Sequence, residues 1–143
     1  MIIALKRLFT TTLALFTVLL IQLPASAADY VQIPYATGVT IYLDADSIDI
    51  RDDHVRVWLK LVPGADSLAG FQRGTHPDAV YFTQLSAFQK ARKTYQILEF
   101  EYYGKDDGLL VEEEFPYEED FFQEIPDVSF MSAVYDEVMK RAK

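Results

Sequence analysis

Residues 54–62 read His-Val-Arg-Val-Trp-Leu-Lys-Leu-Val, and this stretch decides the fold. Every second position is apolar: Val55, Val57, Leu59 and Leu61. The positions between them hold His54, Arg56, Trp58 and Lys60. A repeat of two residues is typical of a β-strand with one buried face. We therefore expect a sheet with a core on one face and with solvent or a second layer on the other.

Shorter runs on both sides of this stretch are also rich in β-forming residues. Upstream, Val39, Ile41 and Leu43 alternate with other residues, and an earlier run at 31–33 precedes a turn at 36–38. Downstream runs cover 81–88, 94–103 and 109–115, with a turn before the last of them. Because short turns join successive runs, we predict a single antiparallel sheet of five or six strands in meander order.

The repeat changes after Pro126. Apolar residues then recur at the spacing of a helix with one buried face: Phe130, Met131, Val134, Tyr135, Val138 and Met139. Asp127 or Ser129 can cap the first turn of this helix. The fold class is therefore predicted to be α+β, with the C-terminal helix packed on one face of the sheet.

Residues 64–79 fit neither repeat. They contain three glycines and turn-forming steps, so we expect a long mobile loop between two strands. We assign this loop no role beyond that of a candidate contact surface.

The first 27 residues have the features of a signal peptide. Lys6 and Arg7 precede an uncharged apolar run that ends at Pro24 and a small-residue site at 25–27. A retained anchor is the weaker reading, because the apolar run is short for a membrane span. A lipoprotein is weaker still, since acylation needs a cysteine and the chain has none. We expect cleavage near Ala27 and a single domain over residues 28–143, periplasmic or secreted from a Gram-negative bacterium, with no membrane span in the mature form.

The mature chain is strongly acidic. Without the two basic residues of the leader, 11 basic and 22 acidic residues remain, and ten of the acids lie between Lys105 and Asp127. Such a surface repels nucleic acid, so we expect no nucleic-acid partner. The acidic run is interpreted first as a solvated face, with a docking surface for a basic partner or weak cation binding as alternatives.

Most catalytic residue sets are missing from the sequence. The absence of cysteine excludes thiol chemistry and zinc ribbons. The only histidines, His54 and His76, are expected to be surface residues, and residues 44–49 lack the glycine and the oxygen ligand of an EF-hand loop. We therefore predict no catalytic residue, no metal site and no cofactor. The alternative is a small periplasmic enzyme that uses carboxylates for acid-base chemistry, drawn from Glu99, Glu101 and residues 112–114, although strand acids more often face solvent opposite basic residues.

Exposed aromatic and acidic side chains are the better candidates for function. Trp58 lies on the polar side of its strand, where either the final helix or the acidic segment covers it or it is free to meet a partner. Exposed aromatic side chains are favoured at protein interfaces. We predict a non-enzymatic module that binds a protein partner of unknown identity, and we leave a homodimer open. The candidate partner-binding residues are Trp58, Tyr103, Glu112, Glu113, Glu114, Glu118, Glu119, Asp120 and Phe121.

Several of these segments, taken in order, resemble the bacterial surface-adhesin protein E family. The residues that carry the resemblance are Tyr42 to Ile48, Val55 to Lys60, Phe88, Arg92, Tyr95, Tyr102, Tyr103, Ile125 and Pro126. The resemblance implies a small antiparallel sheet with a C-terminal helix in an envelope-associated protein without enzymatic activity. The family's best-known relative is a lipoprotein adhesin that binds host matrix proteins and can dimerise. This chain departs from that relative in lacking the lipid-bearing cysteine.

The same resemblance implies a disulfide that this chain has lost. Relatives tie the region after Phe88 to the end of the final helix, and the matching positions here are Lys90 and Met139. The final helix must then be held by its apolar residues alone.

Overall fold

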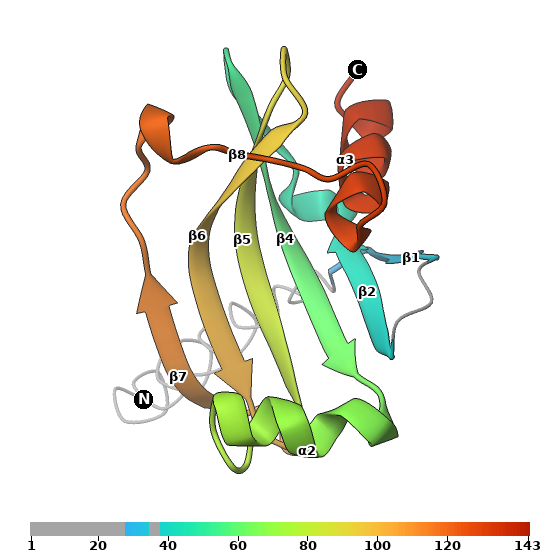
Figure 1. Ribbon diagram of the computed structural model, residues 1–143, viewed down its shortest axis with the longest axis vertical. Coiled ribbons are helices and arrows are strands. Elements are labelled where there is room, and N and C mark those ends of the chain that lie inside the picture. Colours follow the sequence, from blue (N-terminus) through green and yellow to red (C-terminus); the bar gives the residue numbers. More distant parts are fainter. Residues whose placement is uncertain (1–27, 35–37) are drawn as a thin grey trace, which may run out of the picture.

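The computed structural model describes residues 28–34 and 38–143 (Figure 1). The proposed signal peptide lies outside these residues, as does most of the turn expected at 36–38. In the described part, no helix is both long and apolar enough to cross a membrane.

The strands are β1 (Tyr30–Ile33), β2 (Val39–Asp44), β3 (Asp49–Ile50), β4 (His54–Pro63), β5 (Tyr81–Gln89), β6 (Thr94–Tyr103), β7 (Leu109–Glu114) and β8 (Gln123–Glu124). The helices are α2 (Ala65–Gly74) and α3 (Phe130–Arg141), with single 3-10 turns η1 (Ala45–Ser47) and η2 (Glu119–Phe121).

One antiparallel sheet contains all eight strands. Six of them follow the order β1-β2-β4-β5-β6-β7, while the short β3 and β8 pair with β4 and β6 (Figure 1). The predicted meander and the α+β class are confirmed. The long central strands β4 and β5 align Val55 with Phe88 and Leu61 with Phe82, which puts the apolar series of β4 on one face.

The C-terminal helix α3 covers this apolar face, which we call the helix face. Val134 and Val138 of α3 are fully buried against the β4 series, and the ring of Tyr135 meets that of Phe88 edge to face at 6.2 Å. Ser129 caps the helix, because its side chain accepts a hydrogen bond from the Ser132 amide. The other side of the sheet, which carries Trp58, is called the opposite face.

The prediction of a long loop at 64–79 is wrong, because residues 65–74 form helix α2 across one end of the sheet (Figure 1). Gly64 and the internal glycine at position 70 weaken the helical signal in the sequence. Packing outweighs the low helix propensity of these glycines. The ring of Phe71 stacks on that of Phe82, with centroids 5.5 Å apart, and its centroid lies 6.1 Å from that of Tyr102. The partners of Phe71 follow it in the chain and were not visible as a local pattern.

Candidate functional site

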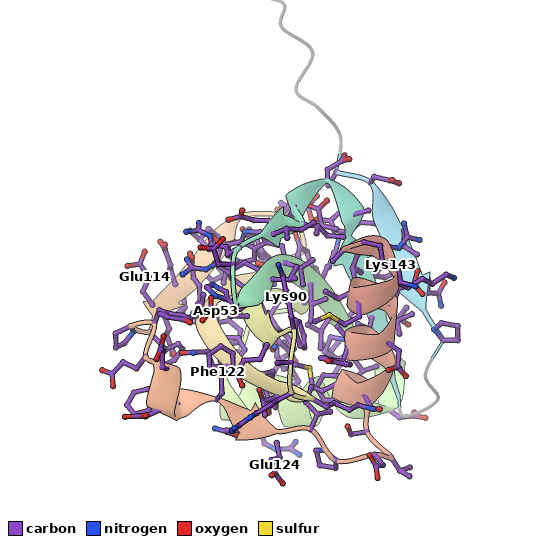
Figure 2. The ribbon with its side chains drawn as sticks, turned by 90° about the horizontal axis from the view of Figure 1, so that it is seen from above. Asp53, Lys90, Glu114, Phe122, Glu124 and Lys143 are labelled. Atoms are coloured by element: carbon purple, nitrogen blue, oxygen red, sulfur yellow. The ribbon has the colours of Figure 1, made fainter. Side chains whose placement is uncertain are left out.

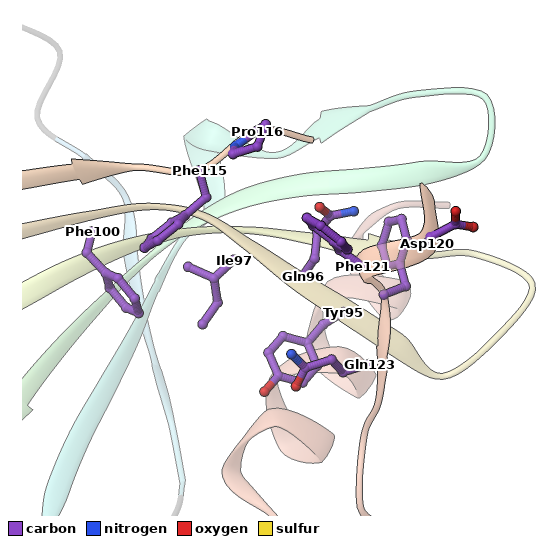
Figure 3. A pocket seen from close by; sticks show the side chains of 10 residues that line it. Tyr95, Gln96, Ile97, Phe100, Phe115, Pro116, Asp120, Phe121 and Gln123 are labelled. Carbon is purple, nitrogen blue, oxygen red and sulfur yellow. The ribbon is translucent and has the colours of Figure 1, made fainter. Parts of the chain in front are cut away.

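A groove opens between β6 and the segment that joins β7 to β8. We call this segment, residues 115–122, the strap. β7 pairs with β6 as far as Glu99, and β8 pairs with β6 at Thr94 and Tyr95, so the strap spans the part of β6 between them. The groove has a volume of about 500 Å³. Its lining comprises Tyr95, Gln96, Ile97, Phe100, Phe115, Pro116, Asp120, Phe121, Phe122 and Gln123 (Figure 3).

Aromatic side chains form the two ends of the groove. At one end Phe115 meets Phe100 edge to face, with ring centroids 6.0 Å apart, and at the other Phe121 projects from η2 near Tyr95 (Figure 3). Phe115 is 42% exposed and Phe121 is 53% exposed. Two exposed rings that line one groove form a shared apolar surface, and such surfaces, unlike single exposed side chains, are typical of interaction sites. The groove is thus an apolar site that is accessible to a partner.

Carboxylates surround the groove. Asp120 lines the groove directly, and Glu118 and Glu119 precede Asp120 on the strap. Glu113 of β7 pairs in register with Phe100, so it lies on the face of the sheet that carries the groove. All four are exposed. Within residues 28–34 and 38–143 the ion pairs are Arg51–Asp49, His54–Asp53, Lys93–Asp136 and Arg141–Glu137, so none of these four carboxylates is in an ion pair. Arg92 and Lys93 line an adjacent cavity together with Glu119 and Asp120, so the rim has four carboxylates against two nearby cations and is net negative.

A polar network attaches the strap to the sheet. The side chain of Gln96 donates to the Glu118 carbonyl (2.9 Å) and accepts from the Glu118 amide (3.2 Å), like a backbone partner in a ladder. Tyr117 stacks on the ring of His54 at 4.8 Å, and its hydroxyl donates to Asp53 at 3.3 Å. The expectation that His54 is a surface residue is wrong: it is 5% exposed, because Tyr117 returns to cover it.

The predicted binding residues do not form one site. Glu113, Glu118, Glu119, Asp120 and Phe121 lie around the groove. Trp58, Tyr103, Glu112 and Glu114 belong to the opposite face, as the pairing of Trp58 with Leu85 and of Glu112 with Glu101 requires. Trp58 and Tyr103 are both partly buried.

Four glutamates stand together on the opposite face of β6 and β7. Glu99 lies opposite Glu114, and Glu101 lies opposite Glu112, so Arg56 and Lys60 of β4 are not their cross-strand neighbours. Carboxylate oxygens of Glu99, Glu112 and Glu114 lie within 4.8 Å of one another. Burial, a hydrogen bond to Glu112 and the neighbouring carboxylates raise the pKa of Glu99 to about 7. Oxygen ligands of this kind suit a hard cation, although exposed acids are common without one.

Phenols next to these acids are shifted as well. The Tyr103 hydroxyl donates to Glu101 at 2.6 Å, and burial together with this bond raises the pKa of Tyr103 to about 12. Tyr81 stacks on Tyr103 at 5.0 Å and holds the Lys60 ammonium 4.2 Å from its ring centroid. These phenols are thus neutral donors at physiological pH rather than bases.

The sequence reasoning missed several residues of the groove: Tyr95, Ile97, Phe100, Phe115 and Phe122. In the sequence they read as ordinary strand or core aromatics, since their exposure depends on the path of the strap. The adjacent phenylalanines at 121–122 were the one available signal in the sequence for an exposed ring, because neighbouring residues of an extended segment point in different directions.

No family model, no curated protein and no solved structure matches this chain. The resemblance to surface-adhesin protein E therefore depends on the quoted residues alone.

Proposed function

We propose that this protein is an exported, non-enzymatic binding module that holds a basic, partly apolar segment of a partner protein in the groove between β6 and the strap. One observation carries the proposal: exposed aromatic rings line an open groove whose rim holds carboxylates that are in no ion pair of the described residues. Protein interfaces combine apolar anchors with a polar rim in this way.

The apolar lining indicates how a partner would be anchored. Phe115 and Phe121 lie at opposite ends of the groove, so one or two apolar side chains inserted between them would remove both rings from water (Figure 3). Burial of such surface contributes about 25 cal/mol per Å² before the costs of association. A short segment can therefore supply useful affinity.

The charge of the rim indicates the partner's chemistry. Glu113, Glu118, Glu119 and Asp120 would repel an acidic segment and attract lysine or arginine beside the apolar anchor. The formal charge of the whole chain, −9, has the same sign, so approach of a basic partner is favoured from a distance. We accordingly expect binding that weakens as salt is added.

Export of the module is part of the proposal. The leader-like residues 1–27 support a periplasmic or secreted protein, and because the chain has no cysteine, no disulfide contributes to its stability. The resemblance to surface-adhesin protein E points to the same compartment and to binding rather than catalysis.

The test is capture from envelope extract by immobilised residues 28–143, followed by affinity measurements on the proteins retained. Phe121→Ala removes an anchor, and a triple variant, Glu118→Gln, Glu119→Gln and Asp120→Asn, removes rim charge. The control, Glu112→Gln with Glu114→Gln, removes two charges from the opposite face, against three in the groove variant. We expect a partner with a basic segment whose binding weakens roughly tenfold in each groove variant, in keeping with an interface hot spot, and is unchanged in the control.

Two results would overturn the proposal. One is that no protein is retained by the native domain, and the other is that every retained protein binds all variants equally. Sedimentation of the native domain alone adds a third readout, since a dimer that Phe121→Ala dissociates would mean that a second copy occupies the groove.

The second candidate function is carboxylate acid-base catalysis. The raised pKa of Glu99, about 7, favours it, because a general acid or base works best near the ambient pH. Against it, Glu99 lines neither the groove nor the two other cavities described in the structure. A hydrolytic activity of the purified domain that Glu99→Gln abolishes would favour this candidate over binding.

A further inference from the structure

The outer edge of β7 is open to a further strand. β7 is the last strand in the sheet order, and β6 is its only partner among the described strands. The strand at the other end of the sheet, β1, lies beside α3 (Figure 1). Figure 2 shows Glu114 of β7 at one side of the molecule and Lys143, which follows α3, at the other. Five of the six residues of β7 are exposed, so this edge faces solvent.

The pairing of β7 with β6 identifies which backbone groups lie on the open edge. The Phe115 amide donates to the Leu98 carbonyl at 2.8 Å, in the same register that pairs Glu113 with β6. Along an antiparallel strand, residues that bond to the neighbouring strand alternate with residues whose backbone groups point away from it. Glu112 and Glu114 are therefore the residues that direct an N–H donor and a C=O acceptor each to the outer edge.

The side chains of β7 differ between the two faces of the sheet. Val111 and Phe115 lie on the helix face, with Glu113 between them, while Glu112 and Glu114 lie on the opposite face. A strand added beside β7 also sends alternate side chains to the two faces. Apolar residues of such a strand would meet Val111 and Phe115 on the helix face, and basic residues would meet the two glutamates on the opposite face.

The glutamates of the opposite face lack a cation in the described part of the chain. Carboxylate oxygens of Glu99, Glu112 and Glu114 lie within 4.8 Å of one another, and none of the three residues is in an ion pair. Like charges on neighbouring strands destabilise the pairing, whereas opposite charges stabilise it. A lysine or arginine on an added strand, next to Glu112 and Glu114, would offset this repulsion.

The same charges make a second copy of β7 a poor occupant of the edge. A two-fold axis at Glu113 would place Glu113 opposite its own copy and Glu112 opposite Glu114. Charged side chains on an edge strand are a common safeguard against self-association. The edge therefore favours a basic strand from a different protein over a copy of itself.

We propose that the outer edge of β7 is a second binding site, at which an extended partner segment with alternating basic and apolar residues pairs with the backbone of Glu112 and Glu114 as a further strand of the sheet. Where peptides are bound in this way, backbone hydrogen bonds supply affinity and alternate side chains supply specificity. The site is separate from the groove and does not rest on the function proposed for it.

The test uses a short blocked peptide in which lysine and valine alternate, with a glutamate–valine peptide as the charge control. Solvent exchange of the backbone amides of residues 28–143 is followed by NMR as peptide is added. At about ten times the Kd of the lysine peptide, exchange of the Glu112 and Glu114 amides should slow roughly tenfold, because it then requires release of the peptide. The Val111 and Glu113 amides, which already face β6, should change little, and the glutamate peptide should have no effect.

Two variants at one position separate backbone pairing from charge attraction. Glu112→Pro and Glu112→Gln remove the same charge, but only Glu112→Pro removes the outward N–H, and edge strands tolerate proline where the N–H faces solvent. We expect Glu112→Pro to bind the lysine peptide roughly tenfold more weakly than Glu112→Gln, the effect of one lost hydrogen bond. Protection of amides in the centre of β4 checks that both variants are folded. If Glu112→Pro is not, Glu114→Pro and Glu114→Gln make the same comparison at the end of β7.

Four results would overturn the proposal. They are unchanged exchange of the Glu112 and Glu114 amides, an equal effect of the glutamate peptide, equal binding by the proline and glutamine variants, and a dimer of the native domain in which these two amides are already protected. Phe121→Ala separates this site from the groove. We expect the lysine peptide to protect the same two amides in this variant, and loss of that protection would mean that the peptide acts from the groove.

Discussion

The opposed glutamates of β6 and β7 make the stability of this edge of the sheet depend on pH. Glu99 faces Glu114 and Glu101 faces Glu112 across the ladder, and like charges directly opposite each other destabilise a strand pair. Burial is the largest cause of the raised pKa of Glu99, followed by the hydrogen bond to Glu112 and the surrounding charges. We predict that Glu99→Gln stabilises the protein at alkaline pH.

The sign follows from the direction of the shift. The pKa of Glu99 rises from 4.5 to about 7 on folding, so the folded protein binds this proton more tightly than the unfolded chain. The resulting stability is fully present below 4.5 and is lost as the pH rises through about 7. A pKa rise of this size corresponds to at most about 3 kcal/mol. Because Glu112 and Glu114 are exposed and water screens the cluster, we expect about 1 kcal/mol.

Urea unfolding of residues 28–143 at about pH 4.5 and about pH 8 measures the effect. Glu99→Gln should raise the free energy of unfolding by about 1 kcal/mol at the higher pH and leave it nearly unchanged at the lower one. Glu113→Gln, which removes the same charge from the helix face of β7, is the control and should show little pH-dependent gain. Equal gains from both variants, or a gain from Glu99→Gln that does not vary with pH, would refute the reasoning.

Three further predictions concern the attachment of α3. Val134→Ala removes two methyl groups from a fully buried site and should lower the free energy of unfolding by about 2 kcal/mol. Val128→Ala, at a residue that is 93% exposed, is the control and should change this free energy little. Similar losses for the two variants in calorimetry would contradict the packing described. Ser129→Ala removes the helix cap and should cost about 1 kcal/mol in the same assay, while a neutral result would mean that the cap hydrogen bond adds nothing. The double variant Lys90→Cys, Met139→Cys should form a disulfide readily and raise the melting temperature of the protein. A bridge over a loop of about 50 residues is worth roughly 4 kcal/mol in the chain-entropy model. Thiols that stay free in the presence of an oxidant would show that the resemblance misplaces the pair.

The regular part of the fold was predictable because its signals are local. The alternation at 54–62 assigns Val55 and Leu59 to the core and Trp58 to the opposite face, and the structure agrees. The helical repeat after Pro126 is equally direct, and Ser129 is the cap that was named as one of two options. Each of these signals repeats over several turns or strand positions, so tertiary packing reinforces it.

The errors share one cause, which is contact between distant segments. The alternation places His54 correctly on the opposite face, but its burial is produced by Tyr117, which is separated from it by 63 positions. Helix α2 likewise depends on contacts with Phe82 and Tyr102, which belong to two strands that follow the helix in the chain. The candidate acids were found as one run in the sequence, yet a strand sends neighbouring side chains to different faces, and Glu112 and Glu113 are therefore on different sides of the sheet.

The path of the strap explains why this segment contacts residues on both faces of the sheet. β7 ends at Glu114 and β8 begins at Gln123, both paired with β6, so the chain between them must bridge a stretch of β6 that neither strand covers. Backbone groups brought there need partners, and the Gln96 side chain supplies both a donor and an acceptor to Glu118. Tyr117 then reaches the opposite face, while Phe121 and Phe122 return to the groove on the helix face. One segment thus lines the groove on the helix face and also packs on the opposite face through Tyr117.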